Sequence, residues 1–302
     1  MEKIGLVTIT YNSAKVIKPF LECVWQQTHD NFQLYIIDNT SIDGTLEILK
    51  KEQDERMCVI RNTSNFGVAK ANNQGIKKAI EDGCDQVLII NNDVEFESNL
   101  IKKLLQVQKE KDCSLVTPKM MYYDNSKHIW YGGGWFKKSK GYLPLHRGMK
   151  ELDTGQYDKI EEVEYTPTCC LLAKKEIFKD IGFMDEKYFV YFEDTDFSFR
   201  IWKDGRHKMY FVPNVEFFHK VGSLTKSFYA KKDKIYRSDF FIKQTTRNHV
   251  YFLKKIGGMY SVLFIFWLFL RNNIRFIVNS QIRKNFKTWR LINKSYLEGV
   301  FL

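Results

Sequence analysis

The sequence predicts an α/β protein with a mixed, mainly parallel sheet flanked by helices, followed by a helical C-terminal extension. In the first 110 residues, short apolar runs alternate with helical patterns of apolar side chains. Strands and helices that alternate in this way form a parallel sheet with helices on both faces. Each predicted strand is followed by Asn, Asp or Thr side chains. Ligands bind such sheets beyond the carboxyl ends of the strands, so these polar residues are candidates for a site.

Four apolar runs predict strands in the first half of the chain, at residues 4–10, 33–38, 58–61 and 86–90. Apolar side chains then repeat at helical spacing, which predicts helices over residues 16–27, 44–55, 67–82 and 98–109. The polar strand ends are Thr10 to Asn12, Asp38 with Asn39, Asn62 to Asn65, and Asn91 to Asp93.

Residues 121–163 interrupt this alternation. Glycines at 132–134 indicate turns, and no clear period follows them. A long irregular insertion in a compact domain is usually a binding loop or a lid. Regular structure is expected again from about residue 165, with a helix over 194–203 and short strands over 209–212 and 215–218.

The C-terminal segment combines an apolar helix with a basic surround. Residues 256–270 carry no charge, and Lys and Arg residues lie on both sides of them. The run is shorter than the about 20 residues that span a bilayer. A basic amphipathic helix is typical of attachment in the plane of an anionic membrane surface. The alternative is a helix buried against the rest of the chain or against a second copy, which would make a homo-oligomer.

The composition bounds the partners and the compartment. The formal net charge is +11, which suits nucleic acid, an anionic membrane or phosphorylated small molecules. No nucleic-acid reading motif is recognisable, so nucleic acid is not an expected partner. The six cysteines form no Cys-x-x-Cys pair, and Met1-Glu2-Lys3 leads straight into the first strand. These features predict a reducing, cytoplasmic setting.

Three acids lie within four positions in Glu193-Asp194-Thr195-Asp196, the most informative stretch of the chain. Like charges at this spacing repel unless a cation, a shared proton or water separates them. Aromatic residues precede the cluster, which favours an apolar wall and hence an acid–base or metal role. The alternative is a solvent-facing helix N-terminus, where acids suit the helix dipole.

Taken in order, the motifs resemble those of inverting family 2 glycosyltransferases with the GT-A fold, particularly bacterial rhamnosyltransferase-like members. The matching segments lie within residues 4–223, and they are 7–12, 36–45, 65–75, 88–93 and the run ending in 193–196. Each motif is modestly specific alone, and five in the expected order are strongly specific. The resemblance implies a catalytic domain over 1–225 and an extension over 226–302. It divides the catalytic domain into a nucleotide-binding half, about 1–120, and an acceptor-binding half, about 121–225.

The resemblance assigns a nucleotide-binding role to Thr10, Tyr11, Asn12, Asp38, Asn65, Gly67, Lys70 and Asn92. Asp38 is expected to accept a hydrogen bond from the imide N–H of uracil or thymine. The alternative for Asp38 is an Asx turn into the following helix.

Asp93 is the expected metal ligand, in a DXD-like element that has Asn91 at its first position. His219 matches a second ligand position, although a lone His after an apolar strand is more often structural. Mg²⁺ or Mn²⁺ would be held against the donor diphosphate, since hard cations need few protein carboxylates there.

Asp194 is the expected catalytic base, with Glu193 and Asp196 as acidic support that orients the acceptor; Asp196 as a helix cap is the alternative. Trp130 and Trp135 are expected to contact the sugar, with ordinary packing as the alternative.

The expected function is inverting transfer of a sugar, best matched by rhamnose from dTDP-rhamnose, to a lipid-linked or polysaccharide acceptor. The enzyme would act in cell-surface glycan synthesis while attached peripherally to the inner face of the membrane. One alternative keeps the mechanism with a UDP-hexose or UDP-N-acetylhexosamine donor. The other is a nonenzymatic membrane scaffold that only binds nucleotide sugar.

Overall fold

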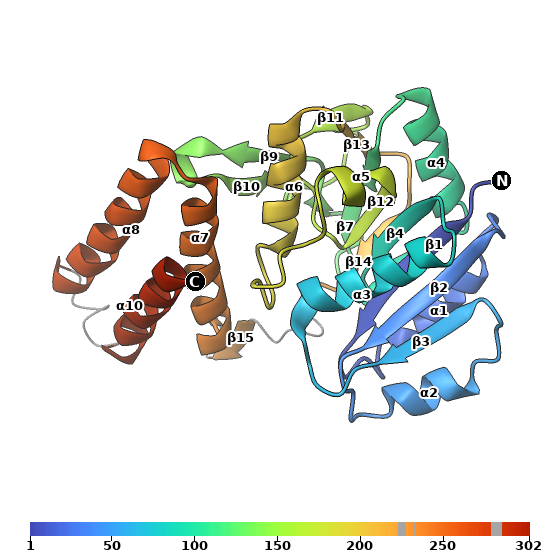
Figure 1. The fold of residues 1–302 in the computed structure, drawn as a ribbon, viewed down its shortest axis with the longest axis horizontal. Helices are drawn as coiled ribbons and strands as arrows, with labels where there is room; N and C mark the ends of the chain where they lie inside the picture. Colours follow the sequence, from blue (N-terminus) through green and yellow to red (C-terminus); the bar gives the residue numbers. More distant parts are fainter. Residues whose placement is uncertain (223–227, 232–233, 279–285) are drawn as a thin grey trace.

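The computed structural model describes residues 1–222, 228–231, 234–278 and 286–302, and it centres on an eight-stranded mixed sheet (Figure 1). The strand order is β11-β13-β6-β12-β4-β1-β2-β3. The parallel part consists of β1 (Ile4–Thr10), β2 (Phe32–Asp38), β3 (Met57–Arg61) and β4 (Gln86–Ile90). All four strands were predicted, because their apolar runs are bounded by turn residues.

The helices of the N-terminal half are also confirmed, with shifted ends. They are α1 (Ile17–Trp25), α2 (Thr45–Lys51), α3 (Gly67–Glu81) and α4 (Leu100–Glu110). Helix α3 lies very close to β1. A Cβ at Gly75 would come within 2.4 Å of the Val7 side chain, so the approach requires glycine there. The register pairs Thr10 with Asp38 and Asp38 with Arg61, which aligns the carboxyl ends of three strands.

The other half of the sheet contains an antiparallel strand that the sequence did not indicate. This half consists of β6 (Leu115–Pro118), β12 (Cys170–Lys174), β13 (Met209–Val212) and β11 (Glu161–Val163). Strand β12 runs antiparallel to both of its neighbours, β4 and β6. Its core residues are buried on both faces, so no alternation of polar and apolar residues marks it.

The insertion predicted to be irregular contains short strands, so that prediction is wrong. A second sheet has the order β5-β14-β7-β8. Its strands are β5 (Val94–Phe96), β14 (Phe217–His219), β7 (Met120–Tyr122) and β8 (Ile129–Tyr131), and a hairpin follows, of β9 (Gly134–Lys137) and β10 (Leu143–His146). Strands of three or four residues are too short for a period-two pattern to be recognised.

The C-terminal half ends in a layer of helices that stands beside the sheet (Figure 1). This layer consists of α7 (Asp239–Ile256), α8 (Gly258–Val278) and α10 (Phe286–Phe301). The other helices of this half are α5 (Glu176–Asp180) and α6 (Glu193–Asp204), and the strands β15 (Phe228–Lys231) and β16 (Lys234–Arg237) precede α7. The expected domain boundary at 225 and 226 lies outside the described residues. Helix α7 packs on α10 and α8 on one side, and on Tyr188, Phe192 and Phe199 on the other.

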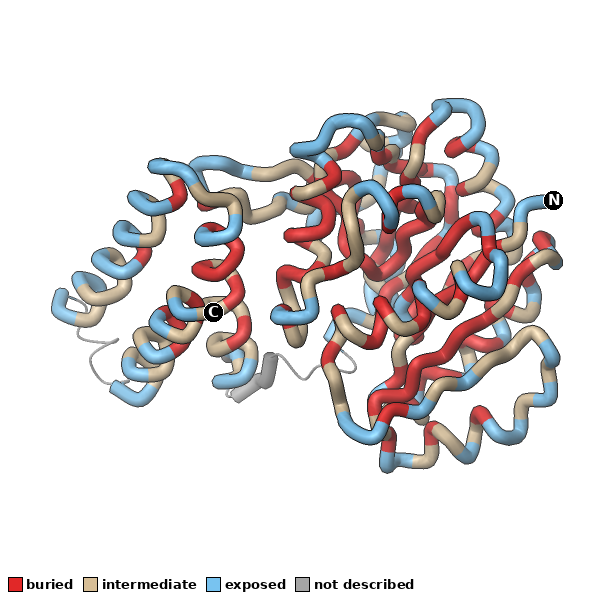
Figure 2. Tube along the Cα trace, viewed as in Figure 1, coloured by how far each residue is buried: buried red, intermediate tan, exposed pale blue. Residues whose placement is uncertain are grey.

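Helix α8 is longer than the apolar run that predicted it. It has 21 residues and is long and apolar enough, by length and composition, to cross a membrane. Only 11% of its apolar window is buried, and Figure 2 shows its outer turns as exposed. The uncharged run alone is too short to span, and the helix reaches this length only by continuing through Arg271 and Arg275 to Val278.

Candidate active site

A cavity of about 240 Å³ opens at the carboxyl ends of β1, β2 and β4. Its lining residues are Ile9, Tyr11, Asn39, Asn65, Gly67, Val68, Asn91, Asn92, Asp93, Phe189, Val190 and Phe240. Five of them were predicted as site residues: Tyr11, Asn65, Gly67, Asn92 and Asp93. The last three of the lining residues come from the segment before α6 and from α7.

Gly67 brings the segment before α6 onto the start of α3. Its φ is +81°, a conformation that side chains rarely adopt, and a Cβ there would lie 2.3 Å from the backbone oxygen of Phe189. The next residue, Val68, donates its N–H to the same oxygen at 2.6 Å. The wall of the cavity at Phe189 therefore depends on a glycine at position 67.

Gly67→Ala should displace Phe189 and weaken binding of the nucleotide expected in this cavity by at least about tenfold, besides costing about 1–3 kcal/mol of stability. Gly83→Ala is the matched control, because Gly83 has φ +78° but open space around its Cβ position. The control carries the backbone strain without the clash. Titration of UDP or dTDP into both variants checks this, and equal affinities for the two would contradict it.

Asp38 and Thr10 lie behind the wall of the cavity and do not line it. The Asp38 carboxylate accepts the Thr10 hydroxyl at 2.8 Å and the Ser41 N–H at 3.0 Å, and Asp38 is fully buried. The bond to Ser41 joins residues three positions apart, one more than in an Asx turn, and it fixes the loop that follows β2. The neighbouring Asn39 faces the cavity instead.

Asn12 and Lys70 also support the surrounding loops and do not line the cavity. Asn12 has φ +54° and accepts the Ile42 N–H at 2.9 Å. The Lys70 ammonium lies 4.2 Å from the centre of the Phe66 ring. Both side chains therefore have structural partners within the fold.

Asn92 faces both the core and the cavity. Its amide donates to the Ile9 carbonyl and to the Ser13 hydroxyl, at 2.5 and 3.2 Å. Its Oδ1 is buried and has no hydrogen-bond partner in the part of the chain that the structure describes. An acceptor left in this state can bind a donor group or a hydrated cation.

Asp93 and His219 meet at the junction of the two sheets. The pairing of His219 with Val94 in β14 and β5 brings His219 Nε2 within 3.5 Å of Asp93 Oδ1. Both residues are nearly buried, at 5% and 7% exposure. The Trp130 ring lies edge-on against the His219 ring, with centroids 4.4 Å apart.

This pair fits a divalent cation as a partial ligand set. Two ligands at right angles and about 2.1 Å from an ion lie about 3 Å apart, close to the separation of Asp93 and His219. Over residues 1–222, 228–231, 234–278 and 286–302, no group of three or more His, Cys, Asp and Glu side chains could hold a metal. The remaining ligands would be water and ligand oxygens, as is common for Mg²⁺.

The acid cluster begins helix α6. Asp194 accepts the Tyr165 hydroxyl at 2.8 Å and the Thr195 N–H at 2.6 Å. Burial raises the pKa of Asp194, and these hydrogen bonds partly oppose the rise. Burial, together with the charge of Asp194, raises the pKa of Glu193 to about 8. The pair can therefore hold a proton near neutral pH.

Glu193→Gln should stabilise the protein increasingly as the pH rises from about 4.5 to about 8. Unfolded Glu193 ionises near 4.5, whereas the pKa of the folded residue is about 8, so ionisation disfavours the folded state across that window. The melting temperature of the variant should exceed that of the wild type by several degrees at pH 9 and by much less at pH 5. The exposed Glu22→Gln is the control. A constant difference across pH would contradict this assignment.

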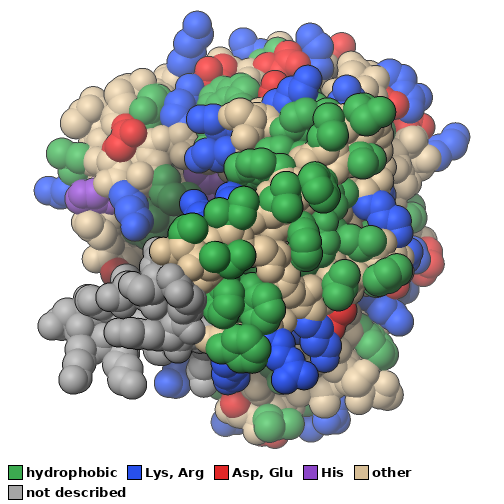
Figure 3. Space-filling model, turned by 90° about the vertical axis from the view of Figure 1, so that its left-hand side faces the viewer, with side chains coloured by type: hydrophobic (Ala, Val, Ile, Leu, Met, Phe, Trp, Pro, Cys, Tyr) green, Lys and Arg blue, Asp and Glu red, His purple; other side chains and the backbone are tan. Residues whose placement is uncertain are grey.

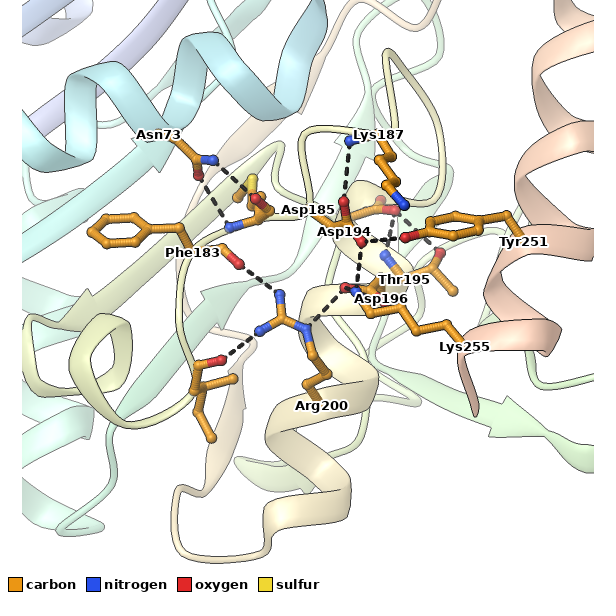
Figure 4. A network of polar contacts seen from close by, with 12 residues as sticks. Asn73, Phe183, Asp185, Lys187, Asp194, Thr195, Asp196, Arg200, Tyr251 and Lys255 are labelled. Atoms are coloured by element: carbon orange, nitrogen blue, oxygen red, sulfur yellow. Dashed lines mark hydrogen bonds and ion pairs between the residues drawn. The ribbon is translucent and has the colours of Figure 1, made fainter. Parts of the chain in front are cut away.

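Asp196, expected to orient the acceptor, is buried and has two cationic partners within the fold. Its carboxylate binds Arg200 at 2.9 Å and Lys255 at 2.9 Å (Figure 4). Arg200 also donates to the carbonyls of Ile181 and Phe183. Asp196 therefore links α6 directly to α7, and through Arg200 to the segment before α6. Its side chain does not cap α6.

The two tryptophans have different surroundings. Trp130 contacts His219 and lies beside the Asp93–His219 pair. Trp135 packs against the Arg147 guanidinium, 4.9 Å from its ring centre, as in the packing alternative. Only Trp130 is therefore placed at the Asp93–His219 pair.

A continuous row of contacts joins the Asp93–His219 pair to the acid cluster. Trp130 contacts His146, with centroids 5.1 Å apart, and His146 contacts Tyr165, at 5.5 Å. Tyr165 then binds Asp194. Burial lowers the pKa of His146 to about 4, so this ring is neutral at physiological pH. Asp93 and His219 are thus linked to Asp194, far away in sequence, through the side chains of Trp130, His146 and Tyr165.

Sequence reasoning missed His146, Tyr165 and Asn248. The first lies in the insertion and the second follows it, and neither belongs to a recognisable motif. Asn248 of α7 is fully buried and donates to the carbonyls of Val190 and Tyr191, at 2.9 and 2.7 Å. Tyr191 and the next residue have positive φ, so Asn248 holds the strained turn that precedes the acids.

The sequence profile described as Glycosyl transferase family 2 matches residues 6–182, more than half of the 302 residues. Curated relatives agree with this match. Glycosyltransferase GlyG of Streptococcus pneumoniae is 26% identical over 193 residues, which are 62% of each chain. This chain therefore spans less than two thirds of the length of GlyG.

Two relatives carry rhamnosyltransferase names. The dTDP-rhamnosyl transferase RfbF of Shigella flexneri is 24% identical over 217 residues, covering 72% of this chain and 68% of the relative. The N-acetylglucosaminyl-diphospho-decaprenol L-rhamnosyltransferase of Mycobacterium tuberculosis is 23% identical over 231 residues, covering 71% and 75%.

Solved structures share the fold. GalNAc-T7, crystallised with UDP, GalNAc and Mn²⁺, has a TM-score of 0.63 at 16% identity, over 84% of this chain and 48% of that one. S. aureus TarS 1-349 has a TM-score of 0.58 at 15% identity, over 99% of this chain and 81% of that one. At these identities the likeness establishes the fold, which is GT-A.

Proposed function

Because the chain belongs to glycosyl transferase family 2, we propose that it moves a sugar from a nucleotide-diphosphate donor onto an acceptor hydroxyl, with inversion. The observation that carries this proposal is the row of contacts from Asp93 and His219, beside the cavity, to Asp194. This row supports joint action of the Asp93–His219 pair, as cation ligands, and of the Asp194 carboxylate, whose pKa is raised. A scaffold that only binds nucleotide sugar would not need the carboxylate.

The cavity at the strand ends is the proposed nucleotide site. Tyr11, Asn39 and Asn65 would contact the nucleoside, and the diphosphate would lie toward Asp93. Asp93 and His219 would hold Mg²⁺ or Mn²⁺, which when bound offsets the charge of the diphosphate. The buried Oδ1 of Asn92 provides an acceptor at the same place.

Asp194 is the proposed base. The acceptor oxygen attacks the anomeric carbon from the side opposite the diphosphate, and the bond from that carbon to the diphosphate oxygen breaks. Asp194 takes the proton that the acceptor oxygen loses. Its raised pKa brings its basicity closer to that needed near neutral pH. Tyr165 orients the carboxylate through its 2.8 Å hydrogen bond.

The proposed donor is dTDP-rhamnose, and the proposed acceptor is a lipid-linked or polysaccharide glycan. The names of RfbF and of the mycobacterial relative support this choice, because one names dTDP-rhamnose transfer and the other a decaprenol-linked acceptor. The second candidate donor is UDP-N-acetylhexosamine or UDP-hexose. It is supported by TarS, which was crystallised with UDP-GlcNAc at a TM-score of 0.54.

We further propose that α8 attaches the protein to the inner face of the membrane. Figure 3 views the side of α8 and α10 and shows apolar side chains gathered there, with Lys and Arg beside them. The exposed apolar residues of α8 include Val262, Leu263, Phe266, Trp267 and Ile274. An in-plane helix explains why α8 also packs against α7 and α10 on its other side.

A donor screen by thermal shift in the presence of Mn²⁺ tests the function. We expect dTDP-rhamnose to raise the melting temperature more than UDP-glucose or UDP-GlcNAc at equal concentration. Transfer to acceptor, or slow hydrolysis of the preferred donor, should accompany binding. Binding without either reaction would favour the scaffold alternative, and a larger shift with a UDP sugar would overturn the donor assignment.

A further inference from the structure

A second cavity, of about 470 Å³, lies between α7, α8, α10 and β10. Its walls are mostly apolar, and Phe192, Phe241 and Tyr296 are among them. Polar groups are concentrated at Arg237, Arg271 and the neighbouring Thr and Asn side chains. None of the reactions described so far uses this cavity.

The second cavity adjoins the acid cluster. Phe192, which lines it, directly precedes Glu193 and the proposed base. At the start of α7, Phe240 lines the nucleotide cavity and the next residue, Phe241, lines the second cavity. The two cavities therefore flank the same segment, residues 189–192, which leads into the helix of Asp194.

The charge in this cavity is positive. No Asp or Glu occurs among its described lining residues, whereas two arginines do. His249 adds no charge, because burial lowers its pKa to about 4 and its Nε2 bonds the Gly141 carbonyl. Arg271 stacks on Trp267 at 4.7 Å. Its Nε is buried without a hydrogen-bond partner in the described ranges.

A buried guanidinium nitrogen without an acceptor is costly, and a planar guanidinium binds phosphate oxygens in pairs. A hydrocarbon chain against the apolar walls would shield this contact from water and so strengthen it. Leu268 and Arg271 of α8 line the cavity, and the opposite face of the same helix, with Phe266 and Leu270, is exposed and apolar. The chemistry of the cavity thus suits a phosphate attached to a long hydrocarbon chain.

We propose that this cavity binds the phosphate or diphosphate of a polyprenyl-linked acceptor, with Arg237 and Arg271 on the anion and the hydrocarbon chain along α8. The proposal rests on the proposed function, since it takes the acceptor to be lipid-linked. It assigns the acceptor lipid to the cavity beside Asp194 and the donor to the cavity at the strand ends. The same anionic chemistry could come from bulk phospholipid, which the experiment separates.

The test measures binding without turnover, using the full chain in detergent micelles that contain polyprenyl diphosphate. Quenching or enhancement of tryptophan fluorescence reports the ligand, because Trp267 stacks on Arg271. Arg271→Gln should weaken binding at least about tenfold. Arg275→Gln is the matched control: this arginine is exposed on the same helix and does not line the cavity. Inorganic diphosphate in empty micelles should bind much more weakly.

A kinetic experiment separates effects on acceptor binding from effects on donor binding. Arg271→Gln and Arg237→Gln should raise KM for a sugar acceptor linked to polyprenyl diphosphate about tenfold and leave KM for the donor unchanged. Partitioning into vesicles of phosphatidylglycerol and phosphatidylcholine is measured in parallel for all variants. Donor hydrolysis, which needs no acceptor, reports whether the proposed function itself fails.

Three outcomes would overturn the proposal. Equal losses in the Arg271 and Arg275 variants would mean attraction to bulk anionic lipid. Unchanged polyprenyl diphosphate binding in both the Arg237 and Arg271 variants would show that the cavity does not bind this lipid. Binding of inorganic diphosphate as tight as that of the lipid would show a simple anion site.

Discussion

Replacement of Asp194 by asparagine should reduce sugar transfer by about 10²- to 10⁴-fold, the range that a general base contributes. Asparagine keeps the size of the side chain and an acceptor for the Thr195 N–H, now bonded at 2.6 Å. The nucleotide cavity does not include Asp194, so donor affinity should change little. Single-turnover transfer and donor-induced thermal shift, measured on the same preparation, separate the two effects.

Glu193→Gln is the matched comparison for this variant, because it removes the adjacent carboxylate of the same helix. It should retain most of the activity above pH 8 if Asp194 is the base. The wild-type rate should rise with pH through the raised pKa of Asp194, since only the ionised form accepts a proton. Tyr165→Phe removes a hydrogen bond that lowers this pKa, so the rise should move to higher pH. A Glu193 variant that loses more activity than the Asp194 variant would reverse the assignment.

Asp93→Ala should lower kcat/KM by about 10²- to 10³-fold, because a cation offsetting the diphosphate charge is worth several kcal/mol. Mn²⁺ affinity, followed by electron paramagnetic resonance with UDP or dTDP present, should fall in parallel. His219→Ala should act in the same direction, since its Nε2 lies 3.5 Å from the Asp93 carboxylate.

Glu95→Gln provides the control for Asp93, since it removes a nearby negative charge that is paired with Lys220 at 2.6 Å. It should leave Mn²⁺ affinity close to that of the wild type. Removal of metal with EDTA should inactivate the wild type, and added Mn²⁺ should restore it. Full activity in EDTA, or an Asp93 variant with normal Mn²⁺ affinity, would exclude a metal from the reaction.

The parallel half of the fold was predictable because its signals are local. The run Ile4–Thr10 is apolar over nearly its whole length and ends in polar residues, and Gly67–Glu81 repeats apolar side chains at helical spacing. The site residues at these strand ends, such as Tyr11 and Asp93, were therefore placed at the correct edge of the sheet. The adjacency of Asn39 to the cavity follows from the same register.

The remaining parts of the candidate site could not be predicted, because they depend on contacts between residues far apart in the sequence. Asp93 meets His219 only because β5 and β14 pair, and those strands have three residues each. The environment of Asp196 is set by Lys255, 59 positions away. An acidic side chain that reaches two cations through the fold looks the same in sequence as one that faces a substrate. Burial of Asp38 could not be distinguished from exposure for the same reason.

Helix α7 sets a limit on how relatives of this protein can be recombined. Asn248 and Lys255 hold the backbone and the acids of a segment some 60 residues earlier in the chain. A chimera that exchanges the C-terminal helices alone would import a helix unmatched to the turn it must support. Exchange should succeed only when residues 185–199 travel with α7, so natural variation in these two stretches is expected to be correlated.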